Sequence, residues 1–137
     1  MDIVGTEQAP RPVGPYSQAV RAGGWVFVSG QIPLDPATGK LEEGGAAAQA
    51  ERALRNLAAV LAAAGCRPAD VRKTTIYLAD LNDFAEVNEV YARFFAAPYP
   101  ARAVVGVASL PKGAAVEIEA VAELPSPDSR GGETRRE

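Results

Sequence analysis

The feature that most constrains the fold is an alanine-rich segment of helical period between residues 45 and 64. Gly65 ends this segment and Pro68 follows, a pattern typical of a helix C-terminus. Because alanine combines a small side chain with high helix propensity, such a helix can lie close against a sheet. The apolar face of the predicted helix recurs at three- and four-residue steps, at Ala50, Leu54, Leu57, Leu61 and Ala64.

Segments rich in β-branched or alternating apolar residues predict the strands of that sheet. Gly23 and Gly24 lie between two of these segments and indicate a hairpin turn. Gly30 follows bulky strand residues, which predicts a bulge or a close approach of two backbones. The predicted strands cover residues 3–4, 18–21, 25–29, 70–78, 102–107 and 116–123.

A second helix is predicted from Asp83 to about Ala96. Asp83 is followed three residues later by Glu86, which is the spacing of a capping box. The resulting order, β-β-β-α-β-α-β-β, predicts an α+β fold with a mixed β-sheet and two α-helices on one face. The apolar face of this second helix consists of Phe84, Val87, Tyr91 and Phe94.

The chain has 137 residues, of which 47% are hydrophobic and 23% charged, as expected for one globular domain. We expect a folded domain over residues 1–124 and a disordered tail over residues 125–137, where no periodicity remains. One face of the predicted sheet carries no helix. Because Val104, Val107 and Val121 are expected partly on that face, self-association is the simplest way to cover it.

Composition excludes several kinds of chemistry. The chain contains no histidine, which rules out Ser-His-Asp and Cys-His catalysis and histidine-ligated zinc sites. A single cysteine, Cys66, allows no internal disulfide. Acid–base chemistry must then come from carboxylates, tyrosines, hydroxyls, backbone or water.

Charge and hydropathy indicate the setting in which the protein works. The formal net charge is -3, and residues 1–124 contain no run of like charge, which argues against a basic groove for nucleic acid. No apolar stretch reaches about 18 residues without a charge, so no membrane span is expected. The first residues do not resemble a secretory leader, and we expect a cytoplasmic protein.

Four side chains are candidates for a functional site. Tyr16 is presented by a proline-rich loop over residues 9–17, and Ser29 ends a strand beside a glycine. Arg102 begins an apolar strand after a proline-marked bend, and Glu117 alternates with apolar residues. Taken singly, each has an ordinary explanation: a ring on the core, a local backbone hydrogen bond, or a solvated charge.

Taken together, these residues lie in segments that resemble the RidA (YjgF) family of reactive-intermediate deaminases, formerly called perchloric-acid-soluble endoribonucleases. The resemblance implies a single-domain, chorismate-mutase-like fold, assembled as a homotrimer with sites in clefts between subunits. It also implies that neither a cofactor nor a metal is needed. The matching segments cover nearly all of residues 3–123: Gly14–Gln18, Val28–Pro33, Lys73–Phe84, Val87–Phe95, Pro100–Arg102 and Val116–Ala120.

The implied reaction is hydrolysis of 2-imino acids, such as 2-iminopropanoate and 2-iminobutanoate, to 2-keto acids and ammonia. These imines form from 2-aminoacrylate and 2-aminocrotonate. The planar guanidinium of Arg102 suits a bidentate grip on the substrate carboxylate, and Glu117 suits deprotonation of the attacking water. Further contacts to substrate or water are expected from Tyr16, Ser29 and backbone groups near Gly30 and Val104.

Two positions bear on the resemblance, and three other functions are also compatible with the sequence. Val104 stands where this family often has cysteine, and Glu119 is a second acid on the face of Glu117, which we interpret as structural or interfacial. The alternatives are a non-catalytic trimeric binder of small carboxylates and a RidA paralogue of a catabolic pathway. An endoribonuclease or translation inhibitor is the third, and the acidic, histidine-free composition argues against it.

Overall fold

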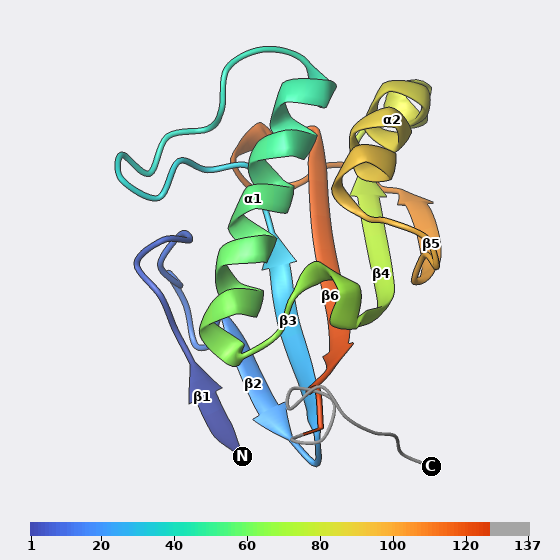
Figure 1. The fold of residues 1–137 in the computed structure, drawn as a ribbon. Helices are drawn as coiled ribbons and strands as arrows, with labels where there is room; N and C mark the ends of the chain where they lie inside the picture. Colours follow the sequence, from blue (N-terminus) through green and yellow to red (C-terminus); the bar gives the residue numbers. More distant parts are fainter. Residues whose placement is uncertain (127–137) are drawn as a thin grey trace.

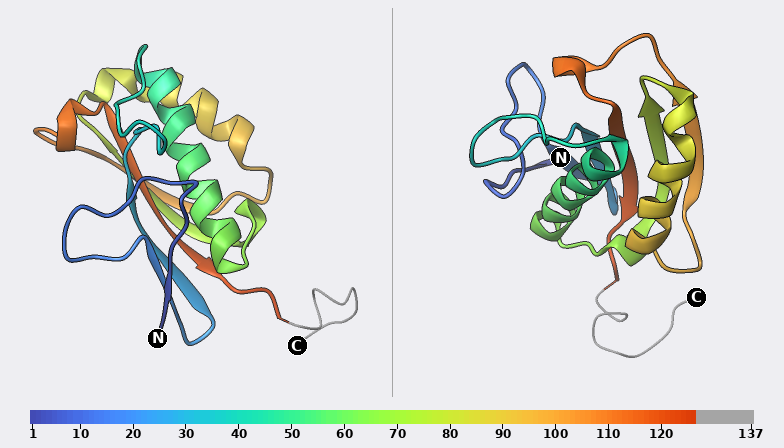
Figure 2. Two further views of the ribbon diagram at one scale, coloured as in Figure 1. Left: turned by 90° about the vertical axis from the view of Figure 1, so that its left-hand side faces the viewer. Right: turned by 90° about the horizontal axis from the view of Figure 1, so that it is seen from above.

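The computed structural model describes residues 1–126, so all but the start of the predicted disordered tail, residues 125–137, lies outside the described residues. Two helices lie on one face of a six-stranded sheet (Figures 1 and 2). The helices are α1 (Ala46–Ala64) and α2 (Phe84–Phe94). The strands are β1 (Asp2–Val4), β2 (Ala19–Ala22), β3 (Trp25–Gln31), β4 (Val71–Leu78), β5 (Ala101–Gly106) and β6 (Val116–Glu123).

The sheet has the order β1-β2-β3-β6-β4-β5. All neighbouring strands pair antiparallel except β4 and β5, which are parallel because α2 carries the chain back between them. The predicted α+β class, the element order and the mixed sheet are confirmed. This topology puts β5 at the sheet edge, and β6 lies two strands further in.

The core fills the space between the sheet and the two helices. In β6 the apolar side chains face the helices and are buried, and Glu117 and Glu119 point to the opposite face, as the alternation predicted. That helix-free face leaves Trp25 and Phe27 39% and 46% exposed. Exposed aromatic area of this kind is typical of a surface that contacts another protein.

Glycine conformations confirm two predicted turns. Gly65 ends α1 in the left-handed region, with φ of 90°, and its N–H donates to the carbonyl of Ala62. Gly23 and Gly24 join β2 to β3, both with positive φ. The β2–β3 turn and the end of α1 therefore depend on backbone conformations that a residue with a side chain would adopt only with strain.

The predicted capping box at the start of α2 is wrong. Asp83 is in the right-handed helical region at the end of a short 3₁₀ turn, Leu81–Asp83, and its side chain caps nothing. The Glu86 carboxylate instead accepts the backbone N–H of Ala47, at 3.1 Å. Glu86 thus caps the N-terminus of α1, where the first backbone N–H groups have no acceptor within the helix. Further along, α2 ends at Phe94 rather than near Ala96.

Val104 does not lie on the helix-free face as expected. It pairs in register with buried Ile76 of β4 and packs against the core under the helices. Side chains alternate along a strand, so Arg102 also points to the helix-covered side. Val121 does lie on the helix-free face, in register with Phe27. Across residues 1–126 no helix has the length and apolar character needed to cross a membrane.

Candidate functional site

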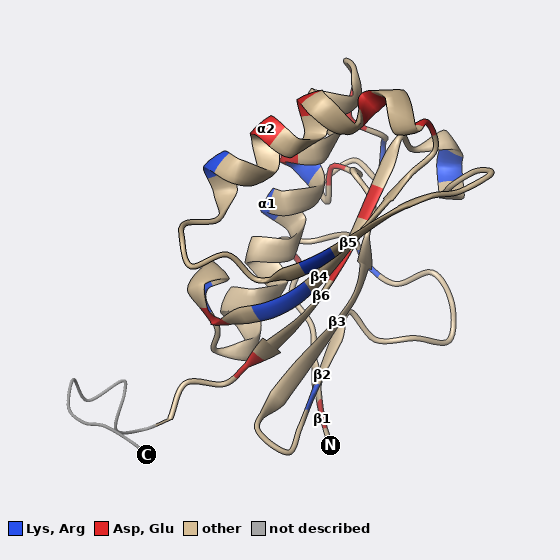
Figure 3. Ribbon diagram, turned by 90° about the vertical axis from the view of Figure 1, so that its right-hand side faces the viewer, with Lys and Arg blue, Asp and Glu red and all other residues tan. Residues whose placement is uncertain are grey.

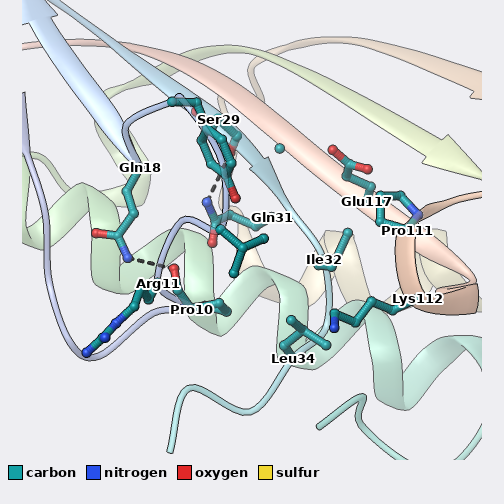
Figure 4. A pocket seen from close by; sticks show the side chains of 13 residues that line it. Pro10, Arg11, Gln18, Ser29, Gln31, Ile32, Leu34, Pro111, Lys112 and Glu117 are labelled. Atoms are coloured by element: carbon teal, nitrogen blue, oxygen red, sulfur yellow. Dashed lines mark hydrogen bonds between the residues drawn. The ribbon is translucent and has the colours of Figure 1, made fainter. Parts of the chain in front are cut away.

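A cavity of about 440 Å³ opens between the proline-rich loop, the end of β3 and the start of β6 (Figure 4). We call it the Glu117 cavity. Its polar side chains include Tyr16, Ser29 and Glu117, and Ile32 and Leu34 contribute apolar walls. Three of the four predicted site side chains are therefore brought together from segments far apart in the chain.

Gly30 explains why Glu117 can occupy this place. The pairing of β3 with β6 shifts register between Val28 and Gln31, so a bulge lies at Gly30, as predicted. A Cβ atom at Gly30 would lie 1.9 Å from the carboxylate oxygen Oε2 of Glu117. Only glycine leaves room for the carboxylate against the backbone.

The Glu117 carboxylate is suited to proton transfer. Burial raises its pKa above the ordinary glutamate value, and the nearby charge of Glu119 raises it further. In the described part of the chain no side chain or backbone N–H donates a hydrogen bond to it. An unpaired, partly buried carboxylate with a raised pKa is suited to accept and return a proton.

Ser29 is held so that its hydroxyl presents lone pairs to the cavity. Its Oγ donates to the carbonyl of Ser17 at 2.6 Å, and its backbone N–H donates to the carbonyl of Gln18 at 2.9 Å. Because a hydroxyl has one hydrogen, Ser29 can then only accept from a ligand. A ligand in this cavity must bring an N–H or O–H to this atom.

The loop that carries Tyr16 is fixed by Gln18, which is 5% exposed. Its side-chain oxygen accepts the backbone N–H of Thr6 at 2.7 Å, and its amide nitrogen donates to the carbonyls of Thr6, Ala9 and Pro10. Figure 4 shows Gln18 reaching back to Pro10. The prolines prevent regular secondary structure in this loop, and the Gln18 side chain supplies hydrogen bonds to its backbone instead.

Arg102 lies elsewhere, in a separate hollow of about 390 Å³ that we call the Arg102 hollow. Its guanidinium carbon lies 4.9 Å from the ring centre of Tyr91 and 5.5 Å from that of Phe84. Its NH1 donates to Oδ1 of Asn88 at 2.7 Å. Phe84, Asn88 and Tyr91 all belong to α2, so Arg102 is bound to the helix-covered side of the sheet.

A family model described as Endoribonuclease L-PSP matches residues 6–124. The chain belongs to this family. Three relatives are informative. The human protein named 2-iminobutanoate/2-iminopropanoate deaminase is 51% identical over 120 residues, 88% of either chain. The crystal structure of RidA from an Antarctic Psychrobacter bacterium has a TM-score of 0.87 at 48% identity, covering 90% of this chain and 100% of that one. The crystal structure of E. coli TdcF with bound serine has a TM-score of 0.86 at 43% identity, covering 91% and 100%.

Within this L-PSP family fold, the predicted residues divide into two groups. Tyr16, Ser29, Gly30 and Glu117 share one cavity, while Arg102 and Val104 are on the other side of the sheet. The predicted pair of Arg102 and Glu117 is therefore not assembled within one chain. Glu119 is outside the Glu117 cavity, beside Tyr77, whose pKa is raised by burial and by the Glu119 charge.

Sequence reasoning missed two residues of this L-PSP family member. Gln18 was assigned to the start of a strand, although a buried amide beside a proline-rich loop is a signal for backbone anchoring. Asn88 was given no role, although it is a polar residue between Phe84 and Tyr91 on the apolar stripe of α2. In the described chain no group of three or more His, Cys, Asp or Glu side chains is placed to hold a metal ion.

Proposed function

We propose that this protein hydrolyses 2-imino acids such as 2-iminopropanoate and 2-iminobutanoate to 2-keto acids and ammonia. The observation that carries the proposal is the Glu117 carboxylate, unpaired among residues 1–126 and wedged against Gly30 beside the acceptor hydroxyl of Ser29. The names of the human, bovine and mouse relatives, at 50–51% identity, support the same substrate class.

The proposed step adds one water molecule and releases one ammonia. The water oxygen bonds to the imine carbon while Glu117 takes the first water proton, and Glu117 passes that proton to the imine nitrogen, which becomes an amine. The C–N bond then breaks as the carbonyl forms, and the nitrogen leaves with the second water proton, returned through Glu117. Ser29 accepts an N–H of the substrate, and the Tyr16 hydroxyl orients substrate or water.

The carboxylate of the substrate is assigned to Arg102. Its guanidinium offers a planar fork for bidentate binding, and Arg102 lines the Arg102 hollow. Because this hollow and the Glu117 cavity lie on opposite faces of the sheet, we assign Arg102 of each site to a neighbouring subunit. A homotrimer built through the helix-free face, with its exposed Trp25 and Phe27, supplies that arrangement.

The proposal is tested by generating 2-aminoacrylate with a serine dehydratase and following loss of the imine with and without this protein. Wild type is expected to accelerate pyruvate formation, and Arg102→Ala and Glu117→Gln are expected to reduce the rate by about 100-fold or more. Glu89→Gln, on an exposed position of α2, is the matched control and keeps full activity. No acceleration by wild type, or full activity in Arg102→Ala, overturns the proposal.

A second candidate is a non-catalytic binder of small carboxylates, favoured by the relative whose crystal structure holds serine. It predicts that wild type binds small carboxylates without accelerating imine loss, and that Glu117→Gln changes nothing. RNA cleavage, which the family description names, has less support. Figure 3 shows both basic and acidic positions on helices and strands, and the formal net charge of -3 does not favour binding of RNA.

A further inference from the structure

The guanidinium of Arg102 rests on three side chains that α2 presents along one face. Phe84, Asn88 and Tyr91 follow one another at steps of four and three residues, so they stack on one side of the helix. The guanidinium carbon lies over both rings, and NH1 donates a hydrogen bond to Asn88. An exposed arginine with contacts on its face and its edge has lost most of its freedom.

The rings beneath Arg102 are themselves fixed. The hydroxyl of Tyr91 hydrogen-bonds the hydroxyl of buried Thr74 at 2.7 Å, and the Tyr91 ring lies 4.7 Å from the ring of Phe95, centre to centre. This platform sets the plane of the guanidinium. Stacking on an aromatic ring leaves rotation within that plane free, because the attraction depends little on it.

Asn88 removes that remaining freedom. Arginine has only donors, so the Asn88 group that it contacts must be the carbonyl oxygen Oδ1. One hydrogen of NH1 is therefore used in the hydrogen bond to Asn88. The edge formed by Nε and NH2 has no hydrogen-bond partner among the described residues, and two parallel N–H groups on one edge match the two oxygens of a carboxylate.

We propose that Asn88 is the positioning residue of Arg102: its amide oxygen turns the guanidinium so that the Nε–NH2 edge faces the substrate carboxylate. This inference rests on the proposed function, in which Arg102 binds that carboxylate. Because Arg102 is already ordered before binding, the ligand does not have to restrict this side chain, and the saving in conformational entropy increases affinity. Asn88 acts through Arg102 and takes no part in proton transfer at Glu117.

The first measurement is the binding of L-serine, which carries an α-carboxylate and nitrogen donors, by calorimetry. Asn88→Ala is expected to weaken binding about tenfold, with the thermal unfolding midpoint almost unchanged because Asn88 is half-exposed. In imine hydrolysis the same variant raises KM with little change in kcat, since the groups that move protons are intact. Glu89→Ala, the exposed neighbour on α2, is the control and binds like wild type.

A double-mutant cycle separates positioning from a merely structural role. If Asn88 works through Arg102, the loss in kcat/KM from Asn88→Ala disappears when it is added to Arg102→Ala. Losses that multiply instead overturn the inference, as does wild-type serine affinity in Asn88→Ala. The proposed function fails separately: Arg102→Ala with undiminished serine binding and hydrolysis removes the carboxylate role on which both proposals depend.

Discussion

Arg102 and Glu117 project from opposite faces of one sheet, on strands β5 and β6 that flank β4. Arg102 pairs in register with Thr74, whose side chain is buried under α2, and Glu117 pairs with Tyr77, which alternates to the other face. The two groups that the proposed chemistry needs at one substrate are thus separated by the thickness of the sheet. A neighbouring chain can bring them together, and a fluctuation of this chain cannot.

Mixed oligomers test this separation directly. We expect Arg102→Ala and Glu117→Ala chains to be inactive alone, and unfolding and refolding them together in equal amounts to restore activity. If each site takes Arg102 from one chain and Glu117 from its neighbour, random assembly gives wild-type sites at about a quarter of the interfaces. The imine assay measures the regain, and light scattering measures the expected trimer mass. A mixture as inactive as its components would exclude shared sites.

Replacing Gly30 by alanine should displace the carboxylate of Glu117. The new methyl group would lie 1.9 Å from Oε2, so the Glu117 side chain must shift from its present position. We expect imine hydrolysis to fall about 100-fold, because displacement of a catalytic group by about an ångström has effects of this size. Gly5→Ala is the control, since its Cβ meets only Gln18 Oε1 at an ordinary 3.5 Å. Equal activities in the two variants would contradict the prediction.

The raised pKa of Glu117 should appear as a pH dependence of stability. Burial and the charge of Glu119 make the folded chain bind this proton more tightly than the unfolded chain does. The free energy of unfolding therefore falls as pH rises from the ordinary glutamate pKa through the raised pKa of Glu117. Glu117→Gln removes that loss, so the variant is more stable than wild type at pH 7 and nearly equal to it near pH 3.

Denaturant titrations at several pH values and one protein concentration measure this difference. Glu119→Gln provides the matched comparison, because it keeps the Glu117 carboxylate and removes the neighbouring charge that contributes to its raised pKa. We expect its pH dependence to lie between those of wild type and Glu117→Gln. A Glu117→Gln variant less stable than wild type at pH 7 would show that the carboxylate is stabilised in the fold.

Gln18→Leu should destabilise the fold and disorder the loop that carries Tyr16. The substitution removes four hydrogen bonds and leaves backbone groups of Thr6, Ala9 and Pro10, which are buried or partly buried, without these partners. The expected cost is about 2–4 kcal/mol, from unsatisfied groups rather than from lost packing. Gln8→Leu, on an exposed residue, serves as control in the same denaturant titration. A decrease in the free energy of unfolding smaller than that caused by losing one exposed hydrogen bond would refute the anchoring role of Gln18.

Periodicity was sufficient to predict the order of elements because each signal is local. The alternation in β6, the three- and four-residue steps of α1 and the glycine turns are all properties of short segments. The same local information predicted the bulge at Gly30, where bulky strand residues precede a glycine. These features depend on neighbours within a few residues along the chain.

The residues of the candidate site came from the sequence, whereas its expected place between subunits came from the family resemblance alone. Alternation shows which residues share a face within one strand, but the relative facing of β5 and β6 depends on the register of β4 between them. For that reason the sequence did not show that Arg102 and Glu117 face apart, and Val104 was assigned to the wrong face. Glu86 was misjudged for a similar reason, because its partner Ala47 belongs to the other helix.

The hydrogen bond from Ser29 to the carbonyl of Ser17 has a consequence for turnover. An imine nitrogen arrives at the Ser29 oxygen with a hydrogen to donate, whereas the ketone formed in its place has only lone pairs, which this oxygen repels. On the proposed function, hydrolysis therefore converts a well-held substrate into a poorly held product. The keto acid is then held less tightly than the imine, so weak inhibition by the product is expected.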